Sequence, residues 1–313
     1  MMKQKFLILG GDLRNIKLAE MLNIDNNKVL SYGLEKSEEI QESVQIEKIK
    51  NLDNAIEKAD IIIAPTPFSS DNESINAPFS SENIKINQLL KPNKNKIFIA
   101  GGIKDKIKEQ LEENYLKVID IMKREELVIL NTIATAEGTI EVAIKNTDKI
   151  LQGSKVLILG FGRVAKIVAN KFSLLSTNVT CSARKISDLA WIQAYGYEAI
   201  NINDMLYDLK DFDIIINTVP QIIIKEKELK HMKPDVLLID LASAPGGIDF
   251  NIAKQMGINC VWALALPGKI APVSSAKFIK EAIYNTLEEN GKKENTNNVE
   301  KCDEKMEKNS KKV

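Results

Sequence analysis

A glycine-rich segment in the second half of the chain has the residue spacing of a dinucleotide site. Gly160, Gly162 and Ala165 form the pattern G-x-G-x-x-A between an apolar run and a helical pattern. The first glycine permits a tight turn, the second lets a pyrophosphate approach the backbone, and the small third residue lets the helix lie against the sheet. Arg163 and Val164 open that helix. We therefore expect cofactor contacts at Gly160, Gly162, Arg163 and Val164; the alternative is a merely structural turn.

The residues at the end of the next apolar run bear on the choice of cofactor. NAD sites usually carry an acid there, about twenty residues after the fingerprint, on the ribose diol. This chain has Cys181-Ser182-Ala183-Arg184-Lys185 in that place. A hydroxyl followed by two cations suits a 2′-phosphate, so the segment favours NADP over NAD, bound by Ser182 and Arg184. Alternatively, Arg184 stacks on adenine or lies in water.

Two further segments follow apolar runs, at the strand ends where open α/β sheets bind ligands. Thr218, Val219 and Pro220 follow one run and are predicted to line the nicotinamide-ribose side. Asp240 and Ala242 follow the next run and are assigned to the same cofactor site. Asp240 could equally be a helix cap or a turn residue, and a catalytic role is the third alternative for it.

A similar phrase near the start of the chain lacks the third small residue. "FLILGGDLRN" (6–15) passes from an apolar run through two glycines into a helical pattern that Asp12 could cap. The alternative is a substrate site that includes Asp12 and Arg14, in which Arg14 or a backbone nest grips a substrate carboxylate. Thr66 lies in the segment "PTP" (65–67), at the end of another predicted strand. We predict that it lines the cleft beside this substrate site.

The alternation of apolar runs with helical patterns predicts a parallel sheet covered by helices in each half of the chain. Runs rich in Ile, Val and Leu lie at 5–11, 28–33, 59–67, 96–102, 116–122, 155–162, 178–184, 197–202, 211–220, 235–243 and 257–268. The predicted fold class is α/β, with two Rossmann-like doubly wound parallel-sheet lobes and a cleft between them. We expect a flavodoxin- or Rossmann-like substrate-side domain over 1–130 and an NAD(P)-binding domain over 131–273.

Three segments outside the strands complete the predicted organisation. A helical pattern at 135–151 is expected to cross between the lobes, with Glu137 near its start as the candidate acid/base. The alternative for Glu137 is a first-turn acid stabilised by the helix dipole. A helix over 274–290 is expected to pack back on the first lobe, and the charged segment 291–313 to be a disordered tail.

Composition limits the classes of partner. The chain of 313 residues has 43 basic and 43 acidic side chains, so no net field favours nucleic acid or a membrane surface. Its three cysteines have no metal-ligand spacing and fit a reducing cytoplasm. A strand begins within the first residues, which argues against a secretory signal, and no apolar run approaches the roughly 20 residues of a membrane span. We expect a cytoplasmic protein that binds no metal, nucleic acid or membrane.

Five segments in combination resemble the A subunits of dipicolinate synthases: "GGDLR", "NTIATAEGTIEVAI", "LGFGRVA", "DLASAPGGIDF" and "ALPGKIAP". The resemblance extends over residues 3–288. It implies NAD(P)-dependent conversion of dihydrodipicolinate, or its hydrated tetrahydro precursor, to dipicolinate in the mother cell of a sporulating bacterium. It also implies a hetero-oligomer in which the partner is a flavoprotein-like B subunit. For the small dicarboxylate substrate, Arg14 and Lys269 are natural partners.

Two other classes of function fit the same residues. One is a different NADP-dependent dehydrogenase, of the shikimate or 2-hydroxyacid type. The other is a non-catalytic nucleotide-binding subunit that regulates a partner, an option left open because the chain shows no obvious pairing of a histidine with an acid; its single His231 is expected at the surface.

Overall fold

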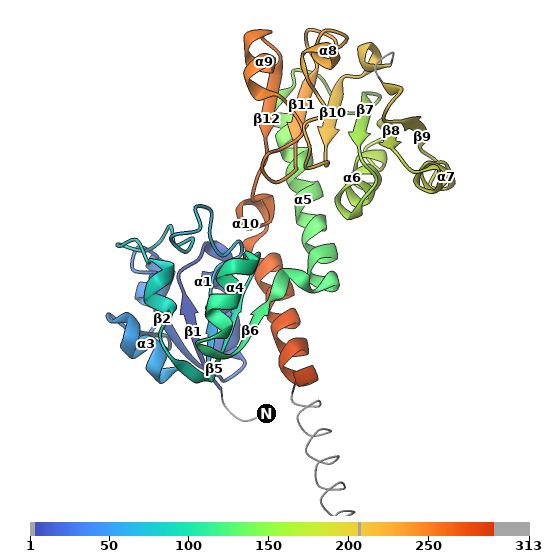
Figure 1. Ribbon diagram of the computed structural model, residues 1–313. Coiled ribbons are helices and arrows are strands. Elements are labelled where there is room, and N and C mark those ends of the chain that lie inside the picture. The colour runs from blue at the N-terminus through green and yellow to red at the C-terminus, as the bar shows by residue number, and fades with distance from the viewer. Residues whose placement is uncertain (1–3, 206–207, 291–313) are drawn as a thin grey trace, which may run out of the picture. The chain divides into compact units, whose positions relative to one another are not determined.

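The computed structural model describes residues 4–205 and 208–290 (Figure 1). These residues form two compact units, of which unit 1 comprises 4–128 and 272–290 and unit 2 comprises 129–205 and 208–271. The sequence places both borders two residues later. The predicted tail at 291–313 lies outside the described residues.

Unit 1 is built on a six-stranded sheet whose neighbouring strands all pair in parallel, in the order β3-β2-β1-β4-β5-β6. The strands are β1 (Lys5–Leu9), β2 (Lys28–Tyr32), β3 (Glu47–Lys48), β4 (Ile61–Ile63), β5 (Asn93–Ala100) and β6 (Tyr115–Asp120). Both faces of the sheet are covered, which explains the unbroken apolar run of β1. Phe6 and Ile8 belong to one buried cluster, and Leu7 and Leu9 to the other.

Helices of unit 1 bury apolar stripes on both faces of this sheet. On one side lie α1 (Leu13–Ile24) and the helix over 272–290, which adds Ala276, Ile279, Ala282 and Ile283 to the cluster of Phe6. On the other side lie α3 (Leu52–Lys58) and α4 (Asp105–Glu112). The remaining short helices are α2 (Glu38–Glu42), η1 (Ile86–Leu89) and η2 (Ile121–Lys123). The predicted packing of the last helix on the first lobe is thus present.

Unit 2 repeats the plan with a parallel sheet ordered β12-β11-β10-β7-β8-β9, the same order read from the opposite edge. Its strands are β7 (Lys155–Leu159), β8 (Asn178–Ala183), β9 (Glu198–Asn201), β10 (Ile214–Asn217), β11 (Leu237–Asp240) and β12 (Asn259–Trp262). Its helices are α5 (Glu125–Asn146), α6 (Arg163–Ser173), α7 (Ile186–Ala194), η4 (Leu209–Asp211), α8 (Glu226–Leu229), α9 (Phe250–Gln255) and α10 (Leu266–Ile270). The predicted α/β class with two doubly wound sheets is confirmed.

The helix α5 corrects the sequence-based prediction. It begins at Glu125, not at residue 135, because the apolar residues that precede the predicted start are helical too; Leu127 is fully buried in unit 1. Glu137 therefore lies in the helix interior, and its interpretation as a first-turn acid is wrong. By length and composition α5 could also cross a membrane, as many core helices of soluble proteins could. Ala136 and Ala143 are fully buried in the core of unit 2.

The strand order fixes where each unit can bind a ligand. In unit 1 the order reverses between β1 and β4, and in unit 2 between β7 and β10. Adjacent loops leave such a point in opposite directions, which opens a crevice at the carboxyl ends of the strands. The glycine turns at Gly10 and Gly160 both lie at these reversal points.

Candidate functional site

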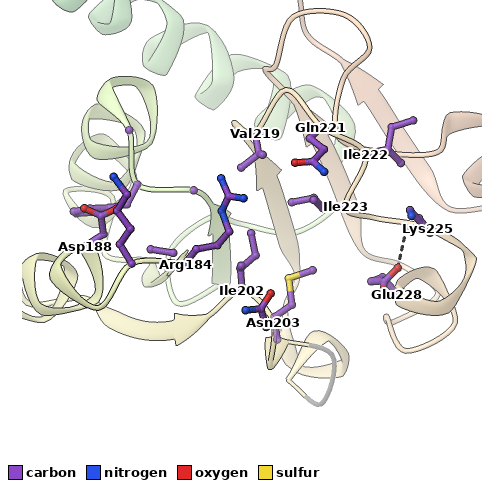
Figure 2. A pocket seen from close by; sticks show the side chains of 16 residues that line it. Arg184, Asp188, Ile202, Asn203, Val219, Gln221, Ile222, Ile223, Lys225 and Glu228 are labelled. Atoms are coloured by element: carbon purple, nitrogen blue, oxygen red, sulfur yellow. Dashed lines mark hydrogen bonds between the residues drawn. The ribbon is translucent and has the colours of Figure 1, made fainter.

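A cavity of about 570 Å³ opens in unit 2 at the carboxyl ends of its strands (Figure 2). Its volume lies within the usual range of small-molecule sites. It is lined by the fingerprint turn, the ends of β8 and β9 and the loop after β10: Gly160, Phe161, Gly162, Ala183, Arg184, Lys185, Asp188, Ile202, Asn203, Met205, Val219, Gln221, Ile222, Ile223, Lys225 and Glu228. Four residues predicted from the sequence, Gly160, Gly162, Arg184 and Val219, are among them.

The two fingerprint glycines are needed for different reasons. Gly160 has a φ of +96°, and a Cβ there would lie 2.7 Å from Thr218 Oγ1, so its turn and packing both require glycine. Gly162 has an ordinary φ of −81°, and a Cβ there would meet no atom of the described residues within 4 Å. No protein contact in this described part explains the missing side chain at Gly162. The empty space fits a ligand that approaches the backbone, as a pyrophosphate does.

The first turn of α6 adds an electrostatic reason for an anion at this place. The helix begins after Gly162 without a side-chain cap and has no acid in its first turn, which contains Arg163 and Val164. The first amides of a helix lack partners within it and carry partial positive charge. A phosphate group at this helix N-terminus would accept hydrogen bonds from these amides, and its negative charge would be stabilised by their partial positive charge.

Cations border the cavity at the end of β8. Arg184 and Lys185 are exposed, and Figure 2 shows the Arg184 side chain extending toward the loop that carries Val219. Arg184 forms no hydrogen bond or ion pair within the described residues, so its guanidinium is available. Asp188, in the first turn of α7, lines the same region and makes the local charge mixed.

The apolar residues on the far wall of the cavity were not predicted from the sequence. Ile202 and Met205 follow β9, and Ile222 and Ile223 follow β10; they supply apolar surface that suits the flat face of a base. Their common signal is position shortly after a strand end, but no glycine or polar residue among them marks a ligand contact.

Several predicted cofactor residues lie behind the cavity wall. Ser182 is fully buried and its hydroxyl has no partner among the described residues. Asp240 is fully buried and Ala242 is buried, while Thr218 donates its hydroxyl to the Leu159 carbonyl at 2.7 Å. Pro220 is exposed next to the lining residue Val219. The strand ends therefore present backbone and loop to the cavity instead of these side chains.

The surroundings of two cysteines in this sheet disfavour the thiolate form. Burial raises the pKa of the Cys181 thiol, on β8, to about 12. Burial, and after it the charge of Asp240, raises the pKa of the Cys260 thiol, on β12, to about 12. Among the residues that the structure describes, no group of three or more His, Cys, Asp or Glu is arranged to hold a metal.

The corresponding turn of unit 1 is closed. The Gly11 amide donates to the Asn76 carbonyl at 3.0 Å, and a Cβ on Gly10 would lie 2.8 Å from the Cβ of Ala77. Asn76 and Ala77 belong to the long connection 64–92 between β4 and β5, which lies over the turn. In the first turn the Gly11 amide and the space at Gly10 are therefore occupied by protein, whereas in the second turn the space at Gly162 is open.

Arg14 and Asp12 form a tight unit beside this closed turn. The Asp12 carboxylate caps α1 by accepting the Arg14 amide at 2.9 Å, which confirms its predicted capping role. It also pairs with the Arg14 guanidinium, at 2.7 Å from Nη2. Nη2 donates in addition to the Thr66 carbonyl. Arg14 is thereby buried and fixed, and within the described residues its Nη1 has no hydrogen-bond partner.

The other residues predicted for chemistry are exposed. Glu137 on α5 lies 2.9 Å from the Nζ of Lys171 on α6, in an ion pair open to solvent. Lys269 on α10 is exposed, as is His231. The surroundings of Glu137 are those of a charge pair at the surface of the protein.

The sheet order, the open glycine turn and the cavity define unit 2 as a nicotinamide dinucleotide-binding domain of the dehydrogenase type. Residues 104–246 match the NAD binding domain of D-isomer specific 2-hydroxyacid dehydrogenases. Residues 5–122 match the N-terminal domain of dipicolinate synthase A subunits. With the relatives described next, these matches show that the chain belongs to the family of dipicolinate synthase A subunits.

The similarity to this family extends over nearly the whole chain. The A subunit of dipicolinate synthase from Bacillus subtilis (strain 168) is 30% identical over 289 residues, which cover 91% of this chain and 96% of that protein. The crystal structure of the A subunit from Bacillus halodurans has 29% identity and a TM-score of 0.81 over 91% of this chain and 98% of that one. The crystal structure of the Bacillus subtilis protein has 28% identity and a TM-score of 0.81 over 92% and 97%.

Gly162 allows a direct test of the cavity. Valine fits the extended backbone at Gly162, and its Cβ would meet no atom of the described residues within 4 Å, yet its methyl groups would occupy the space left for a pyrophosphate. We expect Gly162→Val to raise the Kd for NAD(P) by at least about tenfold, about 1.4 kcal/mol, with the melting temperature nearly unchanged. Titration calorimetry and thermal unfolding measure the two quantities. Gly162→Ala should lose less; undiminished affinity in both variants would refute the fingerprint site.

Proposed function

We propose that the chain catalyses the NAD(P)-dependent dehydrogenation of dihydrodipicolinate, or of its hydrated tetrahydro precursor, to dipicolinate. One observation carries the proposal: the unexplained open space at Gly162 lies beside the uncapped N-terminus of α6, in a member of the family of dipicolinate synthase A subunits. The dehydrogenase-type domain supports an oxidoreductase, and the names of the relatives support dipicolinate as the product.

The proposed reaction requires mainly that the protein orient the substrate relative to the cofactor. A bound nicotinamide would supply the acceptor for the hydride that leaves a ring carbon of dihydrodipicolinate, and the same ring loses a proton as it becomes an aromatic pyridine. Aromatisation favours the reaction, so the protein gains most by holding the two reactants in register. Gly162 and the first turn of α6 would hold the diphosphate. Because Glu137 lies in an exposed pair with Lys171, we assign the proton to water.

We place a substrate carboxylate on Arg14. Its guanidinium is buried and fixed by Asp12 and the Thr66 carbonyl, and within the described residues Nη1 remains without a partner. It lies at the carboxyl ends of the strands of unit 1, where α/β sheets bind ligands. An arginine held in this way loses little side-chain entropy on binding an anion. The exposed Lys269 is our candidate for the second carboxylate.

We infer that NADP is the preferred cofactor. Arg184 is available in the cavity, and Lys185 follows it at the start of α7, so two cations meet a 2′-phosphate where NAD sites carry an acid. The carboxylate of Asp188, which also lines the cavity, is a negative charge that would repel a 2′-phosphate from this end of β8.

We propose a partner and a compartment from the membership of this family. The relatives are named as A subunits, which supports a B subunit, flavoprotein-like, in a hetero-oligomer with this chain. Dipicolinate synthesis supports a site of action in the cytoplasm of the mother cell during sporulation.

The central experiment follows turnover directly. The purified chain, with and without the B subunit, is incubated with dihydrodipicolinate and NADP⁺ or NAD⁺ while the absorbance of the reduced cofactor and of dipicolinate is recorded. We expect equal amounts of both products. Cofactor binding without turnover in either preparation would instead favour the nucleotide-binding regulatory subunit, and turnover of a 2-hydroxyacid or shikimate-type substrate would favour the other dehydrogenase class.

Arg184→Ala tests the choice of cofactor. A charge-assisted contact to a phosphate contributes roughly 1.5–3 kcal/mol, so the Kd for NADP should rise about ten- to hundredfold. The Kd for NAD, which lacks the 2′-phosphate, serves as the internal control and should change little. Equal losses for both cofactors would place Arg184 on the adenine, and a wild-type preference for NAD would overturn the assignment.

Arg14→Ala tests the substrate contact. Loss of a charged hydrogen bond to a carboxylate predicts a rise in KM for the dicarboxylate of roughly ten- to hundredfold, with NADP affinity kept. Because Arg14 also braces Asp12, the thermal unfolding of the variant is measured in parallel. Arg14→Lys, which keeps the charge but not the planar fork, should recover only part of the loss. An unchanged KM in Arg14→Ala would exclude the contact.

A further inference from the structure

One wall of the cavity is a loop that needs support from behind. Residues Val219, Gln221, Ile222, Ile223 and Lys225 line the cavity and belong to the connection between β10 and α8, which has no helix or strand of its own. A site built on a loop keeps its geometry only when neighbouring hydrogen bonds and packing fix that loop. The supporting groups are the last residues of β10 and β11.

Asn217 ends β10 and fixes the start of this loop. Its side chain is fully buried. Its Nδ2 donates to the Val219 carbonyl at 3.0 Å, and its Oδ1 accepts the Val219 amide at 3.1 Å. The amide side chain thus pairs with both polar groups of one backbone residue, and that residue lines the cavity.

Asp240 ends β11, opposite Asn217 in the sheet register, and joins it to a second loop. Its carboxylate is fully buried. Oδ1 accepts the Asn217 Nδ2 at 2.7 Å and the Ala242 amide at 3.0 Å, and Oδ2 accepts the Gly247 amide at 2.7 Å. A carboxylate accepts at both oxygens and donates at neither, so it can satisfy three converging donors where an amide could not.

Gly247 completes the connection between the two loops. Its carbonyl accepts the amides of Ile223 and Ile224, both at 2.9 Å. A Cβ at Gly247 would lie 2.1 Å from the Asn217 Nδ2, so no side chain fits there. The loop 218–224 is therefore held at its start by Asn217 and near its end by Gly247, and both attachments meet at Asp240.

We propose that Asn217 and Asp240 are positioning residues of the cofactor site: they form a buried clamp that holds loop 218–224 in the shape that binds the dinucleotide. The inference rests on the proposed cofactor site. Neither side chain lines the cavity. Both act through the backbone of Val219 and Ile223, which do. This gives Asp240 a role other than the direct cofactor contact predicted from the sequence.

Two variants of the full-length chain test the clamp. Asp240→Asn keeps the shape but turns one acceptor into a donor that faces another donor, and Asn217→Ala frees Val219 while leaving Asp240 its two backbone donors. Hydrogen–deuterium exchange is measured at the amides of Val219, Ile223, Ile224 and Gly247, and titration calorimetry gives the Kd for NADP. We expect exchange faster by at least about tenfold at Gly247, Ile223 and Ile224 in Asp240→Asn, and at Val219 in Asn217→Ala. The Kd should rise by about tenfold or more in each variant.

Asp213→Asn is the matched control. Asp213 directly precedes β10 at the opposite end of the strand, where its carboxylate accepts the Lys155 amide at 2.9 Å and pairs with Lys233. This variant should lower the melting temperature but change neither the exchange at the four amides nor the Kd. A purely structural role for Asp240 would make all three variants behave alike.

The outcomes separate the inference from the proposed function. Wild-type protein that binds NADP, with unaltered exchange or unaltered Kd in both variants, would overturn the clamp alone. Wild-type protein that binds neither NADP nor NAD would overturn the cofactor site and the clamp's role in it. If Asp240→Asn does not fold, Asn217→Ala decides by the same two measurements.

Discussion

Every backbone amide at the carboxyl edge of a parallel sheet needs an acceptor, and the two units meet this demand in opposite ways. In unit 1 the Asn76 carbonyl accepts the Gly11 amide, and Asp12 caps the helix that follows. In unit 2 the helix after Gly162 has no side-chain cap, and the space above the glycine is open. The same strand order therefore gives a closed turn in one unit and an anion site in the other.

The two units also differ in how they hold an arginine near the carboxyl edge of the sheet. Unit 1 holds its arginine beside the turn in a buried pair with Asp12, which fixes the guanidinium and limits what it can still bind. Unit 2 leaves Arg184 without a protein partner in the described residues, in a cavity whose far wall is apolar. A fixed cation suits a small rigid dicarboxylate, whereas an unpaired one at the cavity edge can follow a flexible phosphate group. The proposed roles of the two units rest on this difference.

The sequence predicted the sheets well because strand residues buried on both faces must be apolar, as they are in β1 and β7 after the first lysine of each. It missed β3, whose two residues Glu47 and Lys48 are charged, and it placed the start of α5 too late. At the site, the fingerprint glycines could be predicted because their spacing is set by backbone geometry. Ser182 and Asp240 could not, since a residue at a strand end can face either the cavity or the sheet interior, and one sequence does not say which.

The length of a connecting loop determines whether the carboxyl edge of such a sheet is open to a ligand. The connection 64–92 of unit 1 is long enough to fold back over its own glycine turn and seal it, with Phe68, Ile75 and Ile84 buried beneath. Two sheets with the same strand order can therefore differ in the ligands they bind, without any change to their cores. The arrangement has a consequence for protein engineers: a nucleotide site cannot be transplanted into unit 1 by restoring a third small residue, because the seal would have to be removed and its buried side chains replaced.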